Sequence, residues 1–393
     1  MENERWLLPE GIDELLPREA ARLERMRREL LDLHRAWGYE LVVPPFIEYL
    51  DSLLTGTGQD LDLKTFKLTD QVSGRQLGVR ADMTPQAARI DAHRLRRDVP
   101  TRLCYLGTVL HTTADGFGGT RSPMQVGAEL YGHGDIESDV EVLLLMLATL
   151  ERAGVGDIHL DLGHVGIFRG LARQAGLDAS RETALFEALQ RKAIPEVRAL
   201  AASAGVDAQM AGMFARLAEL NGDADVLEQA REVLAPAGDE VRAAMDALSR
   251  VAAELRARRP DIPVHYDLAE LRAYHYQTGI VFAAFVPGQG TELARGGRYD
   301  DIGKAFGRAR PATGYSADLR TILQLAPADD REDGNAVLAP WGDDPDLLAL
   351  VARLRAGGER VIWSLPRQAG DASAMGCGRV IRQRDGAWQL EDI

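Results

Sequence analysis

The sequence predicts an α+β fold, in which an antiparallel sheet is flanked by helices, and three observations support it. Two apolar stretches, Arg102–Leu110 and Met124–Tyr131, are joined by a glycine-rich loop, as in an antiparallel hairpin. Alanine, leucine, arginine and glutamate dominate residues 170–260, which indicates a helical insertion. A charged linker, 327–334, then leads to a small C-terminal α/β domain at 335–393, so residues 1–326 form the main domain.

Length and composition limit the classes of protein to consider. The chain has 393 residues, 46% of them hydrophobic, which is ordinary for a globular protein of two or three domains. Its formal net charge of -14 argues against a broad nucleic-acid grip. Cys104 and Cys377 lack metal-ligand spacing and are expected to be free thiols in a reducing cytoplasm. We expect no signal peptide, membrane span or metal site.

The chain begins with a predicted helix and edge strand. Leu23, Met26 and Leu30 recur at helical spacing within Glu19–Trp37, and Gly38 ends the helix. Tyr39–Val43 then alternates like a strand and ends in two prolines, which belong at strand ends or edges. This unit could make a dimer contact or could simply pack within the domain.

A predicted hairpin, Phe66–Leu68 with Gln76–Val79, leads into a helix at 86–95. Thr84 is the expected N-cap, followed by Pro85 at the first helical position. Asp82 and Thr84 therefore lie where a strand gives way to a helix. Such a junction faces a ligand in many proteins, although both residues could merely cap the helix.

Polar residues also interrupt the second strand of the central hairpin. Gln125, Gly127 and Glu129 alternate and so share one face. A glycine between two polar side chains suggests a floor that a small ligand approaches closely. The alternative is an ordinary exposed strand face.

The remaining elements are predicted from caps, breaks and periodicity. Ser138 and Glu141 form a predicted capping box for a buried helix, Asp139–Ala153. Further strands are expected at 157–162, 264–268, 279–286 and 291–295, with a helix at 315–325 that leaves Gly314. The C-terminal domain is predicted to contain strands at 337–338 and 361–364, a helix at 346–356 and a hairpin of 380–384 with 387–390.

Five segments, in this order, resemble the catalytic domain of the histidyl-tRNA synthetase family over about residues 8–325. They read VVPPFIEYL, VRADMT, YLGTVLHTTADGFGGTRSPMQVGAELYG, ELRAYHYQTGIVF with ARGGRYDDIG, and ATGYSADLRTIL. The resemblance implies a class II aminoacyl-tRNA synthetase-like antiparallel sheet. It also implies that the first segment forms a homodimer.

Two departures from the family concern ATP. Synthetases hold the triphosphate with one arginine from the second motif and one from the third, and guanidinium forks suit that task. Here His111 and Thr321 stand at those positions. Arg121 remains in the loop, and Arg320 is adjacent to Thr321 but points about 100° away around a helix. The family's ATP-binding positions are therefore predicted to be lost, and adenylation with them.

The amino-acid side of the family's site is largely retained. The resemblance implies that four residues receive an ammonium group, one pairs with a carboxylate and two tyrosines enclose an imidazole. The predicted histidine-binding residues are, in that order, Asp82, Thr84, Gln125, Glu129, Arg272, Tyr276 and Tyr299. Gln277 replaces a second tyrosine of the family.

The C-terminal domain also departs from the synthetases, whose corresponding domain grips the tRNA anticodon. Residues 332–393 carry ten Asp or Glu, seven Arg and no Lys, a net charge of -3 that suits a phosphate backbone poorly.

The whole pattern resembles the regulatory subunits of ATP phosphoribosyltransferase. This implies a non-catalytic chain without cofactor that activates a short-form catalytic subunit within a hetero-oligomer and mediates feedback inhibition by L-histidine, and that binds no tRNA. The alternatives are an active histidyl-tRNA synthetase and another synthetase paralogue that binds an amino acid.

Overall fold

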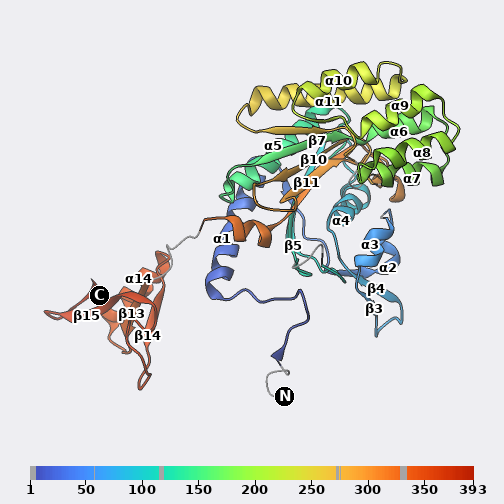
Figure 1. The fold of residues 1–393 in the computed structure, drawn as a ribbon. Coiled ribbons are helices and arrows are strands. Elements are labelled where there is room, and N and C mark those ends of the chain that lie inside the picture. The colour runs from blue at the N-terminus through green and yellow to red at the C-terminus, as the bar shows by residue number, and fades with distance from the viewer. Residues whose placement is uncertain (1–5, 57, 115–118, 271–273, 275, 328–333) are drawn as a thin grey trace. The chain divides into compact units, whose positions relative to one another are not determined.

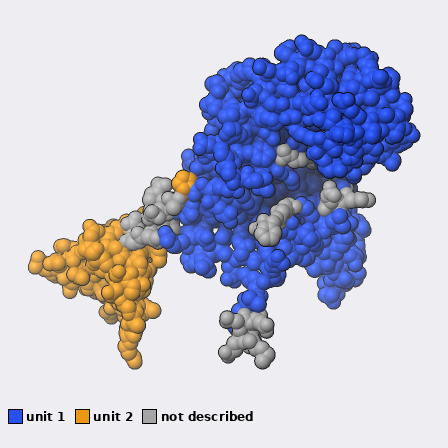
Figure 2. Space-filling view, in the orientation of Figure 1, with its two compact units in different colours: residues 1–326 blue, residues 327–393 orange. Residues whose placement is uncertain are grey.

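The computed structural model describes residues 6–56, 58–114, 119–270, 274, 276–327 and 334–393 (Figure 1). Contacts divide the chain into two compact units, 1–326 and 327–393, which Figure 2 colours separately. Nearly all of the predicted linker lies outside the described residues. Across the described ranges, no helix is both long and apolar enough to cross a bilayer.

A mixed, mostly antiparallel sheet organises the first unit. Within the described ranges it has nine strands, and only the β1–β5 and β7–β9 pairs are parallel. In spatial order the strands are β1 (Glu40–Leu41), β5 (Thr101–Thr108), β6 (Met124–Tyr131), β12 (Ala312–Asp318), β11 (Ala294–Arg298), β10 (Ile280–Phe285), β7 (His159–His164), β9 (Val264–Asp267) and β8 (Asn221–Gly222).

The predicted central hairpin is confirmed as the antiparallel pair β5–β6, with Tyr105 opposite Gly127. Alternation along β6 separates two environments. Val126 and Ala128 join the main hydrophobic core on one face. Glu129 points to the opposite face, because neighbouring residues of a strand project to opposite sides.

Helices cover both faces of this sheet. On the core face, α1 and α5 contribute fully buried leucines such as Leu30 and Leu143. On the other face, Ala88 of α4 packs with Ile302 of α12 and with Phe306. The helices of this part are α1 (Pro17–Ala36), α4 (Thr84–Arg89), a π-helix (Ile90–Leu95), α5 (Ile136–Arg152), α12 (Ile302–Ala305) and α13 (Leu319–Leu325).

The predicted helical insertion is confirmed. Figure 1 shows its helices gathered at one end of the sheet, beside β7 and β10. Phe168 and Phe214, which are fully buried, pack edge to face inside it with ring centroids 6.0 Å apart. Its helices are α6 (Val165–Gln174), α7 (Ala179–Gln190), α8 (Ile194–Ser203), α9 (Ala208–Leu217), α10 (Asp225–Val233) and α11 (Asp239–Arg258).

The predicted helix at 315–325 is wrong in its first half. Ala312–Asp318 is strand β12, which pairs with β6 and β11, and α13 begins only at Leu319. Tyr315 is fully buried and its hydroxyl contacts the side chains of His34 and Thr149. Thr313 and Tyr315 favour strands, and pairing with β6 and β11 on both sides keeps the chain extended as far as Asp318.

Two predicted helix caps are also wrong. The helix α5 begins at Ile136, so Ser138 lies inside its first turn and donates to Asp135 O, while Glu141 pairs with Arg102. Thr84 is the first residue of α4 rather than its cap. Strand β11 begins three residues later than predicted, which places Gly296 and Gly297 within it.

A smaller sheet and the second unit complete the fold. The predicted first hairpin is confirmed as β3 (Lys67–Thr69) and β4 (Gln76–Val79), joined by β2 (Ile47–Tyr49) and flanked by α2 (Leu50–Leu53) and α3 (Gln59–Lys64). In the second unit, α14 packs on a sheet ordered β14-β13-β15-β16. These elements are β13 (Gly334–Pro340), α14 (Pro345–Ala356), β14 (Val361–Ser364), β15 (Cys377–Arg384) and β16 (Ala387–Asp392).

Candidate functional site: a buried carboxylate among tyrosines

Glu129 is the centre of the candidate site. It is 1% exposed, and the hydroxyls of Tyr105 (2.8 Å) and Tyr299 donate to its two carboxylate oxygens. Burial raises the pKa of Glu129 to about 8, against the opposing effect of these hydroxyls. A cation that enters next to Glu129 would restore its charge, so the site is suited to a positively charged or proton-donating ligand.

Glycines make room for this carboxylate. Gly314 lies directly opposite Glu129 in the β6–β12 pair, and a Cβ there would overlap the carboxylate. A Cβ on Gly127 would lie 2.5 Å from the Tyr105 hydroxyl. The expectation that a ligand approaches Gly127 is therefore wrong, because the Tyr105 phenol occupies that space.

Asp82, Thr84 and Gln125 join the same network. Gln125 Nε2 donates to Asp82 Oδ1 at 2.8 Å, and the backbone N–H of Thr84 donates to the same oxygen at 3.0 Å. The Thr84 hydroxyl lies 2.9 Å from the Tyr105 hydroxyl, which connects this group to Glu129. Hydrogen bonds thus link four of the predicted residues, and the link passes through Tyr105, which was not among the predicted residues.

Tyr276 and Tyr299 form a stacked pair at this site. Their ring centroids are 5.0 Å apart and their planes differ by 23°. The Tyr276 hydroxyl is buried, and no hydrogen-bond partner for it exists among the described residues. Such an unpaired buried group costs about 1–3 kcal/mol, which a ligand could recover. Arg272 lies outside the described residues.

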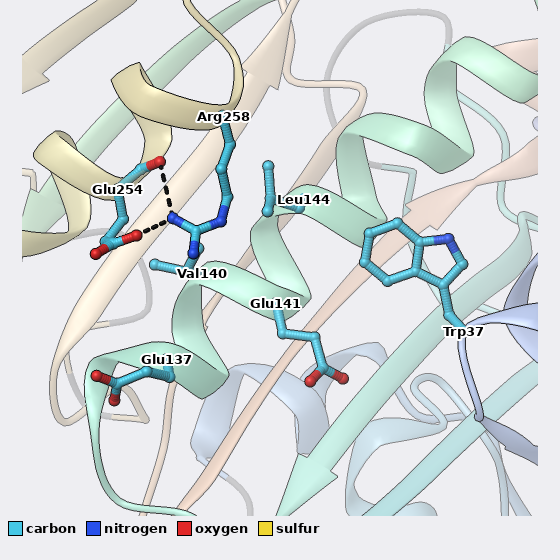
Figure 3. Close-up of a pocket in the computed structure, with 7 residues that line it drawn as sticks. All are labelled: Trp37, Glu137, Val140, Glu141, Leu144, Glu254 and Arg258. Carbon is cyan, nitrogen blue, oxygen red and sulfur yellow. Dashed lines mark hydrogen bonds and ion pairs between the residues drawn. The ribbon is translucent and has the colours of Figure 1, made fainter.

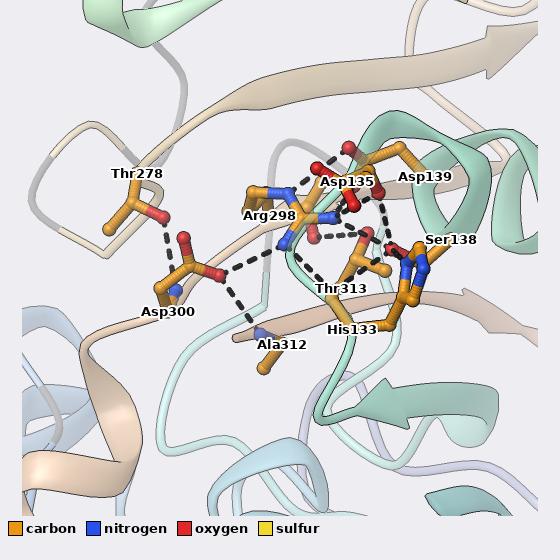
Figure 4. Close-up of polar contacts among 10 residues, drawn as sticks. His133, Asp135, Ser138, Asp139, Thr278, Arg298, Asp300, Ala312 and Thr313 are labelled. Carbon is orange, nitrogen blue, oxygen red and sulfur yellow. Dashed lines mark hydrogen bonds and ion pairs between the residues drawn. The ribbon is translucent and has the colours of Figure 1, made fainter. Parts of the chain in front are cut away.

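Arg298 fixes the strand end that carries Tyr299. Its guanidinium is buried. It pairs with Asp139 of α5 at 3.0 Å and with Asp300 at 3.1 Å. It also donates to Ser138 Oγ at 2.8 Å (Figure 4). Asp300 Oδ1 in turn accepts from the Ala312 N–H, which ties β11 to β12. Tyr299 therefore sits on a rigid support.

The two positions predicted to have lost ATP-binding arginines are engaged elsewhere. His111 Nε2 donates to Ala81 O at 2.9 Å. The Thr321 hydroxyl donates to Asp318 Oδ2 at 2.8 Å. Neither side chain supplies the guanidinium fork with which an arginine holds a phosphate.

The neighbouring arginines serve the fold. Arg121 donates to the backbone oxygens of His111 and Glu10 and lies 5.3 Å above the Phe66 ring. Arg320 pairs with Asp13 and donates to Ser122 Oγ at 2.9 Å. Both guanidinium groups are thus committed to contacts within the chain.

A hollow of about 250 Å³ lies apart from these residues, at the end of α1 and between α5 and α11 (Figure 3). None of the predicted site residues lines it. Its carboxylates have partners: Glu141 pairs with Arg102, and Glu254 pairs with Arg258. We therefore place the candidate site at Glu129. The lining residues are Trp37, Glu137, Val140, Glu141, Leu144, Glu254 and Arg258.

The sequence analysis missed Tyr105, which bonds to both Glu129 and Thr84. A signal was present, since Tyr105 lies in an apolar strand whose hairpin partner carries Gly127. A large ring opposite a glycine across a hairpin predicts that the ring covers the glycine. The hairpin register was needed to see it.

Comparisons with known proteins identify the family of each unit. The profile described as Histidyl-tRNA synthetase matches residues 11–322. The profile described as ATP phosphoribosyltransferase subunit HisZ C-terminal domain matches residues 334–391.

Two relatives that cover almost the whole chain carry the same name. Proteins named "ATP phosphoribosyltransferase regulatory subunit" are 61% identical over 383 residues in Alkalilimnicola ehrlichii (97% of this chain, 96% of that protein) and 60% identical over the whole of both chains in Thioalkalivibrio sulfidiphilus.

Solved structures show the same fold. A Bacillus halodurans structure titled as an ATP phosphoribosyltransferase regulatory subunit/histidyl-tRNA synthetase matches with a TM-score of 0.82 at 26% identity, over 94% of this chain and 95% of that one. Histidyl-tRNA synthetase from Nostoc matches in fold with a TM-score of 0.78 at 18% identity, over 96% and 91% of the two chains.

The predicted class II synthetase-like fold is thus confirmed, and the second unit matches a domain named for the regulatory subunit rather than for a synthetase. The chain belongs to the histidyl-tRNA synthetase-like family and, within it, to the regulatory subunits of ATP phosphoribosyltransferase.

Proposed function

We propose that this chain activates a short-form ATP phosphoribosyltransferase catalytic subunit and makes it sensitive to L-histidine, without catalysis of its own. The relatives at 60–61% identity are named as regulatory subunits of that enzyme, which supports the partner. The histidine effector rests on the site itself.

The observation that carries the effector is the buried carboxylate beside an unpaired hydroxyl. Glu129, at 1% exposure, faces a stacked tyrosine pair, and the Tyr276 hydroxyl lacks a partner among the described residues. An imidazole N–H or an ammonium group would donate to the carboxylate, and an imidazole nitrogen would satisfy the hydroxyl. Asp82, Thr84 and Gln125 complete a polar wall that suits the amino-acid end of the ligand.

Aminoacylation is not supported by the opposite side of the site. His111 and Thr321 bond to their own chain, and Arg121 and Arg320 are held by backbone oxygens and by Asp13. A triphosphate would have to break these contacts to recruit a cation. We therefore assign the chain a regulatory role and no synthetase activity.

Regulation then follows from linkage. If histidine binds one arrangement of the assembly more tightly than another, it shifts their balance by that difference and no more. Histidine in this site would favour the inhibited arrangement of the catalytic partner.

We also propose a cytoplasmic hetero-oligomer built on a homodimer of this chain. The edge strand β1 pairs with β5 alone among the described strands. Its last residue, Leu41, is 49% exposed, and Val43 just after it is 82% exposed. An apolar sheet edge of this kind is a ready surface for a second copy.

Reconstitution tests the proposal directly. The full chain is mixed with a short-form phosphoribosyltransferase, and phosphoribosyl-ATP formation is followed with and without L-histidine. We expect a clear rise in rate on addition of this chain and a loss of that rate as histidine is added. A rate that is independent of this chain would overturn the partner, and a rate insensitive to millimolar histidine would overturn the effector.

A further inference from the structure

The helical insertion holds one tyrosine of the β9–β10 connection very tightly. Tyr274 is 3% exposed, and its hydroxyl donates to Glu182 of α7. Its ring packs against Phe186 of α7 and Phe168 of α6, with centroids 5.1 Å and 5.3 Å apart. Two helices of the insertion therefore surround this side chain.

Arg169 of α6 strengthens the attachment. Its guanidinium lies 4.9 Å from the Tyr274 ring centroid, and its NH2 group donates to two backbone oxygens, those of Tyr274 (2.9 Å) and Gln277 (3.0 Å). These two carbonyls flank Tyr276 in the chain. The insertion thus fixes the backbone on both sides of the residue that enters the candidate site.

Tyr276 transmits this attachment to the carboxylate. Its ring stacks on Tyr299, whose hydroxyl donates to Glu129. A continuous set of contacts therefore runs from Glu182 in α7, through Tyr274 and the backbone to Tyr276, and on to Glu129. The contacts of Tyr274 described above are all with the helical insertion, so its influence on the site is expected to act through Tyr276.

We propose that Tyr274 is a positioning residue, by which the α6–α7 part of the insertion sets the orientation of Tyr276 and hence the affinity for histidine. This rests on the proposed function of the site. Because coupling between two sites is reciprocal, histidine binding also changes the binding free energy of any partner that contacts α6 and α7. The insertion is then part of the regulatory machinery and more than a structural addition.

The test compares four variants of the full chain by calorimetry with L-histidine and by thermal unfolding. Tyr274→Phe and Glu182→Ala each remove the hydrogen bond and are expected to weaken histidine binding at least about fivefold, the lower end of ordinary coupling between sites. Glu182→Gln keeps an acceptor for the hydroxyl and is expected to bind like the wild type. The double variant Tyr274→Phe/Glu182→Ala should bind no more weakly than either single variant, because both remove the same contact.

Tyr39→Phe is the matched control. It removes another tyrosine–carboxylate hydrogen bond, from Tyr39 to Glu141 at 3.1 Å, in the same unit but outside the set of contacts described above. It is expected to lower the unfolding temperature and leave the histidine affinity unchanged, which separates positioning from general destabilisation.

The outcomes distinguish the two proposals. Wild-type protein that binds no histidine overturns the proposed effector, and this inference with it. Wild-type protein that binds histidine, together with a Tyr274→Phe variant that binds equally well, overturns this inference alone. An affinity loss in Tyr39→Phe as large as that in Tyr274→Phe would also overturn it.

Discussion

The amino-acid side and the phosphate side of the candidate site differ in what their polar groups are free to do. On the amino-acid side, the Glu129 carboxylate and the Tyr276 hydroxyl are buried near Gly314 and the stacked tyrosine rings. The hydroxyl has no hydrogen-bond partner among the described residues. On the phosphate side, Arg121 and Arg320 are already satisfied by their own chain. The proposed function therefore requires that the amino-acid side binds a ligand while the arginines of the phosphate side serve the fold.

The sharpest way to break this comparison is to look for adenylation. Removal of one preorganised donor typically lowers a rate by about 10²–10³, so loss of two arginines predicts a rate at least about 10⁴ below that of a synthetase. We expect no detectable histidine-dependent exchange of pyrophosphate into ATP. An active histidyl-tRNA synthetase serves as the positive control, and measurable exchange by this chain would show that the phosphate side still works.

The next largest effect is expected at Glu129. Glu129→Ala should weaken histidine binding by at least about a hundredfold, because loss of one partner of a buried charged pair costs about 3–5 kcal/mol. Inhibition by histidine should be relieved to the same extent. Calorimetry and inhibition curves measure both, with Glu129→Gln as the variant that keeps the side-chain shape. Inhibition that stays unchanged would remove Glu129 from the site.

The ionisation of Glu129 gives a prediction that needs no ligand. Because its pKa in the folded chain is raised to about 8 from 4.5, the folded state binds more protons than the unfolded state between these values. The free energy of unfolding should therefore fall as pH rises from about 5 to 8, by at most about 1.4 kcal/mol per pH unit from this group.

Chemical denaturation of the wild type and of Glu129→Gln across that range isolates the contribution of Glu129. Glutamine cannot titrate, so the free energy of unfolding of Glu129→Gln minus that of the wild type should increase as pH rises. Parallel curves would mean that the carboxyl group is not held in its neutral form.

The smallest effect is expected on the phosphate side, at Arg121. Arg121→Ala removes a contact with the Phe66 ring and hydrogen bonds to two backbone oxygens, so a loss of about 1 kcal/mol of stability is expected. Histidine affinity should not change. A large loss of ATP binding in this variant would instead show that Arg121 serves a nucleotide, which would weaken the contrast drawn here.

How much could be predicted depended on whether the signal was local. The hairpin β5–β6 follows from two apolar stretches and a glycine-rich loop, and the insertion follows from composition over many residues. Strand β12 was missed because it runs directly into α13 at Leu319, and its pairing with β6 and β11 is not a local signal. Ser138 likewise resembled a cap by spacing alone, whereas α5 starts two residues earlier.

The same division applies to the site. Asp82, Thr84, Gln125, Glu129, Tyr276 and Tyr299 were found through motifs, and the structure brings these residues together. Their roles in histidine binding stay predictions. Tyr105 and Tyr274 escaped notice because their importance comes from neighbours that are distant in the sequence, Glu129 and Glu182.

The bare backbone at Gly314 has an evolutionary consequence. Any side chain there would collide with the Glu129 carboxylate, so the two positions are not independent in descent. Replacement of the glutamate with a small residue would remove the main obstacle to a methyl group at 314, although Ala128 O would still lie 2.9 Å from it. If Glu129 binds the effector as proposed, relatives that keep both Glu129 and Gly314 should be the ones that respond to histidine.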